Sequence, residues 1–391
     1  MIKIDIGQVR DETPGCSQVL HFNNAGASLQ PDTVFQAVVD HLDLERRIGG
    51  YEAKAQSQEK VDRFYSAFAT LLNCQPEEIA YVENATRAWD MAFYSIPFVR
   101  GDRILTGQTE YASNYLAFLQ AERRHGLRID VVPNDSTGQI SVDELEAKID
   151  DRVKLIAITH VPSHGGLVNP AAAIGLIARK YGILYLLDAC QSVGQMPIDV
   201  KKIGCDMLSG TGRKFLRGPR GTGFLYVRQA CIESLEPPFV DLHAATWVDE
   251  DRFEIRKDAK RFENWESHVA GRIGLAHAVD YALGIGLPPI WNRVRYLADV
   301  LRSRLRDSPG IVVHDMGKEQ CGIVTFTKEG EAASAIHKRL GGQGINISVS
   351  TVESALLDMK SRGLEEVARA SVHYFNTDGE IERFCEALDR G

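Results

Sequence analysis

Between about residues 75 and 230 the sequence alternates short apolar runs with stretches of amphipathic helical pattern. The apolar runs fall at 104–105, 129–132, 155–158, 183–187 and 223–227, and the helical patterns near 85–94, 112–125, 141–148 and 171–181. Several runs are apolar at every position, which is typical of strands covered on both faces. Strand and helix in turn at this spacing predict an α/β fold with a large, doubly wound, mostly parallel sheet.

A different pattern begins near residue 235. Segment 237–261 is rich in aromatic, acidic and proline residues, and we expect an irregular connection there. Helical patterns then cover 269–283 and 289–306, followed by short strand and helix patterns at 311–313, 322–326, 332–340, 345–348, 369–372 and from 378 onward. We therefore predict an N-terminal arm over residues 1–25, a large domain over 26–265 and a smaller α+β domain over 266–391.

Composition limits the class of protein. The chain has 391 residues, 44% of them hydrophobic, and a formal net charge of −8 without a long run of either sign. A surface of this kind gives no general attraction to nucleic acid or to an anionic membrane. The charged N-terminus lacks the apolar core of a signal peptide, and no stretch approaches the ~20 apolar residues of a membrane span. We expect a soluble, cytoplasmic protein.

The cysteines argue against metal binding. Seven are scattered along the chain, and none forms a C-x-x-C pair: 16, 74, 190, 205, 231, 321 and 385. Metal sites and disulfide frameworks need closer or paired spacings, so we expect reduced thiols and no metal.

Two polar positions follow apolar runs. Asp188 comes directly after one run, where it could cap a helix or hold a cationic group of a ligand; the residue alone does not decide between these readings. Lys214 lies among arginines and glycines, in a segment that is either an exposed basic loop or an anion-binding site. Nearby cations disfavour a protonated lysine and so favour an amine nucleophile. An aspartate 26 residues before a lysine, with a strand-like stretch between them, is the arrangement of a pyridoxal 5′-phosphate (PLP) site.

Three motifs extend this interpretation to a family: Thr159-His160-Val161, Asp188-Ala-Cys-Gln191 and Thr211-Gly-Arg213-Lys214. The chain resembles the class V aminotransferases, which include the cysteine desulfurases and belong to the fold-type I PLP enzymes. The resemblance runs from the His21-Phe-Asn-Asn stretch to the Tyr374-Phe-Asn-Thr stretch. It implies PLP as cofactor, an amino-acid substrate, and a homodimer in which segment 263–267 of the partner lies near the phosphate.

The resemblance also implies roles for single residues. Lys214 would form the Schiff base with the cofactor, Asp188 would pair with its pyridinium, and Gln191 would bond its 3′ oxygen. Ala85 and Thr86, at the start of a helix, would hold the phosphate together with Thr211 and Arg213.

Further implied roles concern the ring and the substrate. Tyr111, in the Glu110-Tyr111-Ala-Ser-Asn114 stretch, would stack on the cofactor ring where many relatives have histidine. Arg369 would grip the α-carboxylate of the substrate, with Asn24 and His373 close by. Ser163 stands where an asparagine is usual.

The reaction is predicted from a missing residue. A cysteine desulfurase of this family uses a loop cysteine, and the corresponding segment 344–354 has none. The missing cysteine argues against a desulfurase. The stretches His21-Phe-Asn-Asn-Ala-Gly-Ala and Ile48-Gly-Gly-Tyr-Glu-Ala are similar to those of bacterial C–S lyases of thiol-metabolite pathways, such as those making ergothioneine. This resemblance implies β-elimination by a C–S lyase acting on an S-substituted cysteine or its sulfoxide, with an aminotransferase and then an amino-acid epimerase as alternatives. A dinucleotide-binding dehydrogenase is excluded because no strand-Gly-x-Gly-x-x-Gly-helix stretch occurs. A non-catalytic binding protein is disfavoured because both Lys214 and Asp188 are present.

Overall fold

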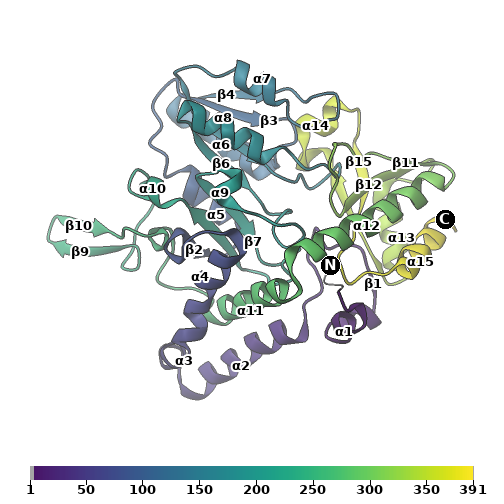
Figure 1. Cartoon of the computed structure of the whole chain (residues 1–391), viewed down its shortest axis with the longest axis horizontal. Coiled ribbons are helices and arrows are strands. Elements are labelled where there is room, and N and C mark those ends of the chain that lie inside the picture. The colour runs from purple at the N-terminus through teal and green to yellow at the C-terminus, as the bar shows by residue number, and fades with distance from the viewer. Residues whose placement is uncertain (1–3, 391) are drawn as a thin grey trace.

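A seven-stranded sheet forms the centre of the computed structural model, which describes residues 4–390 (Figure 1). In spatial order its strands are β2 (Ile79–Val82), β8 (Gly223–Val227), β7 (Met207–Thr211), β6 (Leu184–Asp188), β5 (Val153–Thr159), β3 (Arg103–Gly107) and β4 (Arg128–Val132). Strand β8 runs in the direction opposite to the other six strands. The predicted fold, a mostly parallel α/β sheet of the fold-type I class, is confirmed.

Helices cover both faces of this sheet. They include α5 (Ala85–Phe93), α6 (Ala112–His125), α7 (Val142–Ala147), α8 (Ala171–Tyr181), α9 (Val200–Ile203) and α10 (Gln229–Ile232). Neighbouring strand residues point to opposite faces, so Leu186 enters one core and Leu187 the other. Burial on both faces explains why the strands read as unbroken apolar runs.

A second, antiparallel sheet lies toward the C-terminus. Its order is β11 (Ile311–Val313), β12 (Ile323–Lys328), β15 (Glu366–Ser371) and β14 (Ser348–Thr351), and it packs with α12 (Leu287–Asp307), α13 (Ala333–Gly341) and α15 (Asp378–Asp389). The short strand β1 (Leu20–His21) pairs with β13 (Ile345–Asn346), and Phe22 stacks on Phe384 in this core. The described part of the predicted N-terminal arm, from residue 4 onward, thus reaches the smaller sheet; residues 1–3 and 391 lie outside the described residues.

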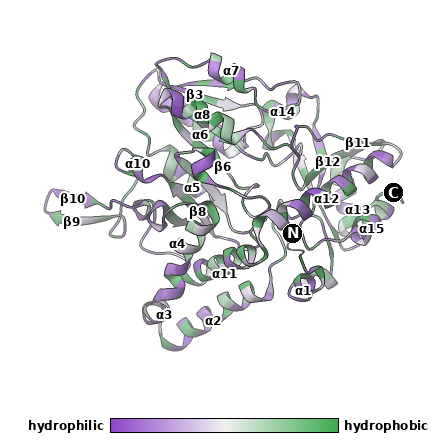
Figure 2. Cartoon of the chain, viewed as in Figure 1, coloured by the Kyte–Doolittle hydropathy of each residue, from purple (hydrophilic) through white to green (hydrophobic). Residues whose placement is uncertain are grey.

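The domain boundary that we predict at residue 266 lies just before a long helix. Helix α11 (Val269–Ile285) packs against α2 (Asp32–Ile48) and α4 (Gln58–Leu72), beside the large sheet, and the chain bends at Gly286 before α12. The approach is close at Gly274, where a β-carbon would collide with Cγ2 of Val38. Figure 2 shows the hydrophobic colour along α11.

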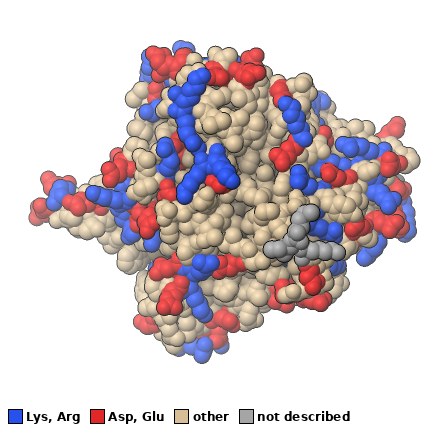
Figure 3. Space-filling view, in the orientation of Figure 1, with Lys and Arg blue, Asp and Glu red and all other residues tan. Residues whose placement is uncertain are grey.

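The remaining elements are short, and most connect the larger ones. Helices α1 (Ile6–Asp11), α3 (Gly50–Gln56) and α14 (Leu356–Ser361) and four 3-10 turns (Pro14–Ser17, Pro76–Glu78, Ala259–Phe262 and Val352–Ser354) complete the described helices. Among residues 4–390 no single helix has both the length and the apolar character to cross a membrane; α11 and α12 do so only as a pair bent by 82°. Acidic and basic side chains are intermixed on the face shown in Figure 3.

The segment predicted to be irregular contains a hairpin. Strands β9 (Ala245–Asp249) and β10 (Arg252–Ile255) pair and project from the body (Figure 1). Glu263 fastens the hairpin's base because its buried carboxylate accepts hydrogen bonds from Tyr65 and His243. Trp247 on the hairpin is 71% exposed. An aromatic residue normally indicates a buried position, so the sequence did not indicate a strand with both faces in solvent.

Candidate active site

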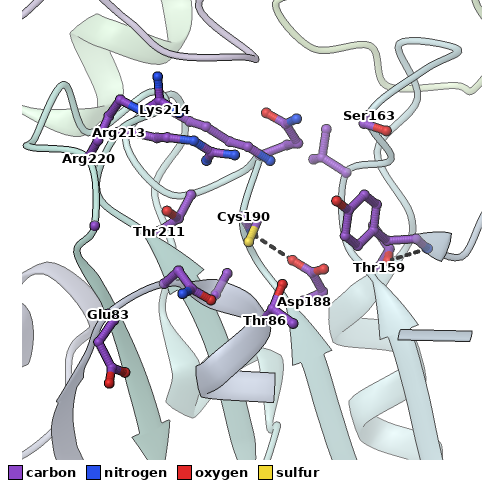
Figure 4. A pocket seen from close by; sticks show the side chains of 16 residues that line it. Glu83, Thr86, Thr159, Ser163, Asp188, Cys190, Thr211, Arg213, Lys214 and Arg220 are labelled. Carbon is purple, nitrogen blue, oxygen red and sulfur yellow. Dashed lines mark hydrogen bonds between the residues drawn. The ribbon is translucent and has the colours of Figure 1, made fainter. Parts of the chain in front are cut away.

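A cavity of about 530 Å³ opens where three parallel strands end. Thr159, Asp188 and Thr211 are the last residues of β5, β6 and β7 (Figure 4), and ligands of such sheets bind at this edge. Eight predicted residues line the cavity: Ala85, Thr86, Tyr111, Asp188, Gln191, Thr211, Arg213 and Lys214. Its volume lies within the usual range for small-molecule sites.

Asp188 is held in a fixed orientation. One carboxylate oxygen accepts from the main-chain N–H of Cys190 at 2.8 Å, and the other accepts from Nδ2 of Asn114 at 3.0 Å. The residues that follow form turns and no helix, so the helix-cap reading of Asp188 does not apply. The carboxylate presents a fixed negative charge to the cavity.

Lys214 lies in the loop that follows β7, and the three arginines of this loop have different surroundings. Arg217 is 1% exposed and donates to the Leu29 carbonyl and the Tyr374 hydroxyl, whereas Arg213 and Arg220 line the cavity. The loop is therefore no simple exposed basic segment. Burial lowers the pKa of Lys214, and the charges of Arg213 and Arg369 act in the same direction. A larger share of the amine is thus neutral and nucleophilic.

The start of α5 provides main-chain donors at the other end of the cavity. Asn84 caps the helix by accepting from the N–H of Arg87 at 2.9 Å. The N–H groups of Ala85 and Thr86 precede the first helical hydrogen bonds, which makes them candidates for binding an anion in the cavity. Thr211 and Arg213 line the same cavity (Figure 4).

Tyr111 stands at the cavity mouth with 39% of its surface exposed. Its main-chain N–H donates to a carboxylate oxygen of Glu110 at 2.9 Å and contacts the Thr159 hydroxyl at 3.3 Å. The backbone that carries the ring is thus fixed, while the ring has an open face.

The three residues predicted to contact substrate occupy different places. Arg369, on β15, does not line the cavity but reaches its wall, because Nη1 donates to the carbonyl of Ser163 at 3.1 Å and Nε has no partner among the described residues. Burial and then Arg213 lower its pKa to about 10. Asn24 and His373 are fully buried and bonded within the protein, to Ser371 and Phe215. This geometry gives Asn24 and His373 supporting positions rather than contacts with a substrate.

Cys190 and Arg220 are among the wall residues that sequence reasoning missed. Cys190 lines the cavity next to Asp188, and burial followed by the Asp188 charge raises the pKa of its thiol. Its place two residues after the aspartate was the available signal. Arg220 also lines the cavity, although nothing in the sequence separates it from Arg217.

The cavity's groups match those of PLP one by one. A neutral amine suits the aldehyde, a carboxylate suits the pyridine nitrogen, and free N–H groups at a helix start suit the phosphate. Oε1 of Gln191 is buried without a partner among residues 4–390, so it is an acceptor that a phenolic hydroxyl would satisfy. The described residues contain no group of three metal-binding side chains.

Comparison with known proteins decides the family. A family model described as "Aminotransferase class-V" matches residues 20–384. The chain belongs to the aminotransferase class-V family. It is accordingly an enzyme that uses PLP as its cofactor, as predicted from the motifs around Asp188 and Lys214.

Relatives match the chain over its whole length. A protein of Methanothermobacter thermautotrophicus named "Probable cysteine desulfurase" is 28% identical over 100% of this chain and 98% of its own. One of the same name from Xylella fastidiosa is 32% identical over 95% and 90%. The apo structure of the cysteine desulfurase of Thermococcus onnurineus NA1 superposes with a TM-score of 0.93 at 27% identity, covering 100% of this chain and 99% of that one.

These relatives correct the predicted reaction. We predicted a C–S lyase, and argued against a desulfurase because segment 344–354 has no cysteine. The full-length similarity to proteins named cysteine desulfurase overturns that prediction.

Proposed function

We propose that this enzyme removes the sulfur atom of cysteine in a PLP-dependent desulfurase reaction and transfers it to a thiol that the chain itself does not supply. The observation that carries the proposal is the full-length similarity to proteins named cysteine desulfurase. A cavity with a buried lysine and a fixed aspartate supports it.

The chain's residues would divide the work as follows. PLP, when bound, supplies an electron sink for negative charge that develops on the substrate. Lys214 attaches the cofactor and then, as a neutral amine, moves a proton at the α-carbon of the substrate. Asp188 would pair with the ring nitrogen, and Tyr111 would cover one face of the ring. Arg369 holds the α-carboxylate through its paired N–H groups.

The acceptor of sulfur is the unusual part of this proposal. Among the described cysteines only Cys190 lines the cavity, and its raised pKa keeps it as a thiol, which is a poor nucleophile. We therefore infer an added thiol, R–SH. The Cβ–S bond of cysteine breaks and an S–S bond to the acceptor forms. Cβ takes up the proton that R–SH loses. Cysteine and R–SH thus give alanine and R–SSH without another oxidant or reductant.

The test is a product analysis with the PLP-loaded enzyme and L-cysteine, with and without dithiothreitol. We expect alanine and released sulfide in equal amounts with dithiothreitol, slower formation of alanine without it because L-cysteine is itself a thiol, and no alanine from the K214A variant. Pyruvate and ammonia in place of alanine would refute the proposal. One equivalent of alanine per chain without added thiol, abolished in C190S, would identify Cys190 as the acceptor and refute the external thiol.

We also propose a homodimer formed through helix α2. Phe35, Val39 and Leu42 share one face of this helix and are 57%, 38% and 45% exposed, a spacing that makes a continuous apolar stripe. We expect the parent to elute as a dimer in chromatography with light scattering and the F35D/L42D variant as a monomer. The control is L176D, which changes a leucine on α8 that is 66% exposed. A parent monomer, or an intact dimer in F35D/L42D, would contradict this assembly.

A further inference from the structure

A buried carboxylate lies behind the cavity wall. Glu110 is 5% exposed and does not line the cavity. It accepts hydrogen bonds from the hydroxyl and main-chain N–H of Thr159, from the Thr106 hydroxyl, from the N–H of Tyr111 and from Nδ2 of Asn114. Two of these donors, Thr159 and Tyr111, belong to residues of the cavity itself.

Asn114 joins this carboxylate to Asp188. Its Nδ2 donates to Glu110 at 2.8 Å and to Asp188 at 3.0 Å. A side-chain amide has two N–H bonds, so both are used on the two carboxylates. Asn114 is 3% exposed, so water does not compete for these bonds. The orientation of Asp188 therefore depends on Glu110 through one shared amide group.

The charge of Glu110 responds to this setting. Burial raises its pKa to about 7, although the hydrogen bonds from Thr159 and Asn114 act against that rise. The titratable groups that face it are Asp188, which raises its pKa further, and the hydroxyl of Tyr185. A protonated ring nitrogen paired with Asp188 would favour the ionised form of Glu110. Because such coupling is reciprocal, an ionised Glu110 would also favour protonation of that nitrogen.

We propose that Glu110 is a positioning residue for the cofactor: through Asn114 it orients Asp188, and its negative charge helps the ring nitrogen of PLP to keep its proton. This inference rests on the proposed role of Asp188. Glu110 touches neither the cofactor nor the reacting atoms, and its effect passes through the shared amide. A purely structural Glu110 would instead only fasten β5 and α6 together.

The experiment measures the protonation state of the ring nitrogen directly. Parent and variants are loaded with PLP carrying ¹⁵N in the ring, and the ¹⁵N chemical shift is followed from pH 6 to 10. With two charges separated by one bridging amide, the expected effect of E110Q is a midpoint of deprotonation lower by about one pH unit, or tenfold in the proton equilibrium. E110D keeps the charge and should stay closer to the parent than E110Q. T106V removes one donor to Glu110 without changing its charge, and should match the parent.

The outcomes separate the possible roles. An E110Q midpoint equal to that of the parent, or a T106V shift as large as that of E110Q, overturns the inference and leaves Glu110 a structural residue. If E110Q fails to fold, N114L removes the bridge while Glu110 remains; a lower midpoint is then expected, and an unchanged one overturns the inference. D188N tests the role of Asp188, on which the inference rests. If the D188N midpoint equals that of the parent, the proposed role of Asp188 fails. If D188N shifts the midpoint and E110Q does not, only the role of Glu110 is refuted.

Discussion

Replacing Asp358 with asparagine removes the centre of a buried ionic cluster near the cavity. Its carboxylate oxygen contacts Nε2 of His164 and Nη1 of Arg362, both at 3.0 Å, and the Asp358 side chain is 1% exposed. His164 directly follows Ser163, whose carbonyl accepts from Arg369. The cluster therefore joins the loop after β5 to α14, next to the residue predicted to hold the substrate carboxylate.

The expected loss follows from burial. Removing one member of a buried ion pair costs about 3–5 kcal/mol, because the partner charge stays without compensation. Asparagine keeps one acceptor oxygen, and Arg362 also donates to the His314 carbonyl. We therefore expect D358N to lower the free energy of unfolding by about 3 kcal/mol.

Urea unfolding followed by circular dichroism measures this loss. The matched control is D43N, since Asp43 pairs with Arg46 on the surface, where the side chains are 39% and 77% exposed; we expect a much smaller change there, because water and salt screen an exposed pair. A loss below about 1 kcal/mol in D358N would refute the reasoning that burial gives this cluster its strength.

The effect has a defined pH dependence. Burial works against the charge of Asp358, but the hydrogen bond from His164 and the charges of His164 and Arg362 outweigh it, so its pKa is lowered. A carboxyl whose pKa is lower in the folded state stabilises the fold above its unfolded pKa of ~3.9, and loses that contribution as the pH falls through the folded value. The difference between parent and D358N should therefore be full at pH 7 and shrink below about pH 4.

Three further predictions concern the site. Borohydride reduction of the PLP-loaded enzyme should place the pyridoxyl group on the peptide containing Lys214, and an adduct on another lysine would rule out this assignment. R369K should raise KM for cysteine about 10- to 100-fold with an unchanged cofactor absorption band, because a lysine lacks the paired N–H groups; an unchanged KM would count against carboxylate binding. In the apo protein, the pKa of Glu110 of about 7 lies above its unfolded value, so its protonated form stabilises the fold at low pH. The parent should lose about 3 kcal/mol relative to E110Q as the pH rises from 4.5 to 7, and parallel stability curves for the two proteins would disprove the shift.

Pattern predicted the large sheet well, because both faces of its strands are buried and the apolar runs are unbroken. It failed where neighbours decide the structure. Helix α11 looks like the start of a new unit, yet it packs on α2 and α4, and no local signal in 269–285 names those partners. Hairpin β9–β10 has exposed strands, so it lacks the alternation of buried and exposed residues that marks a strand.

The site was predictable where chemistry demands a residue type. Lys214, Asp188 and Gln191 carry recognisable motifs, and all line one cavity. Asn24 and His373 have the same residue types as substrate ligands, but their polar atoms are bonded inside the protein. Glu110 and Asn114 stand in the stretch that we singled out for Tyr111, but their bonds to Thr159 and Asp188 join positions far apart in sequence, so the stretch alone does not reveal their roles.

Lys214 and Arg369 stand on different sheets, the first after β7 and the second on β15. A small molecule held at both ends would therefore act as a removable crosslink between the two sheets. Saturation with a carboxylate-bearing ligand would then raise the melting temperature and sharpen the thermal transition, because the bound molecule ties the two sheets together. Occupancy of the cavity would be readable as a change in the shape of the melting curve, even without turnover.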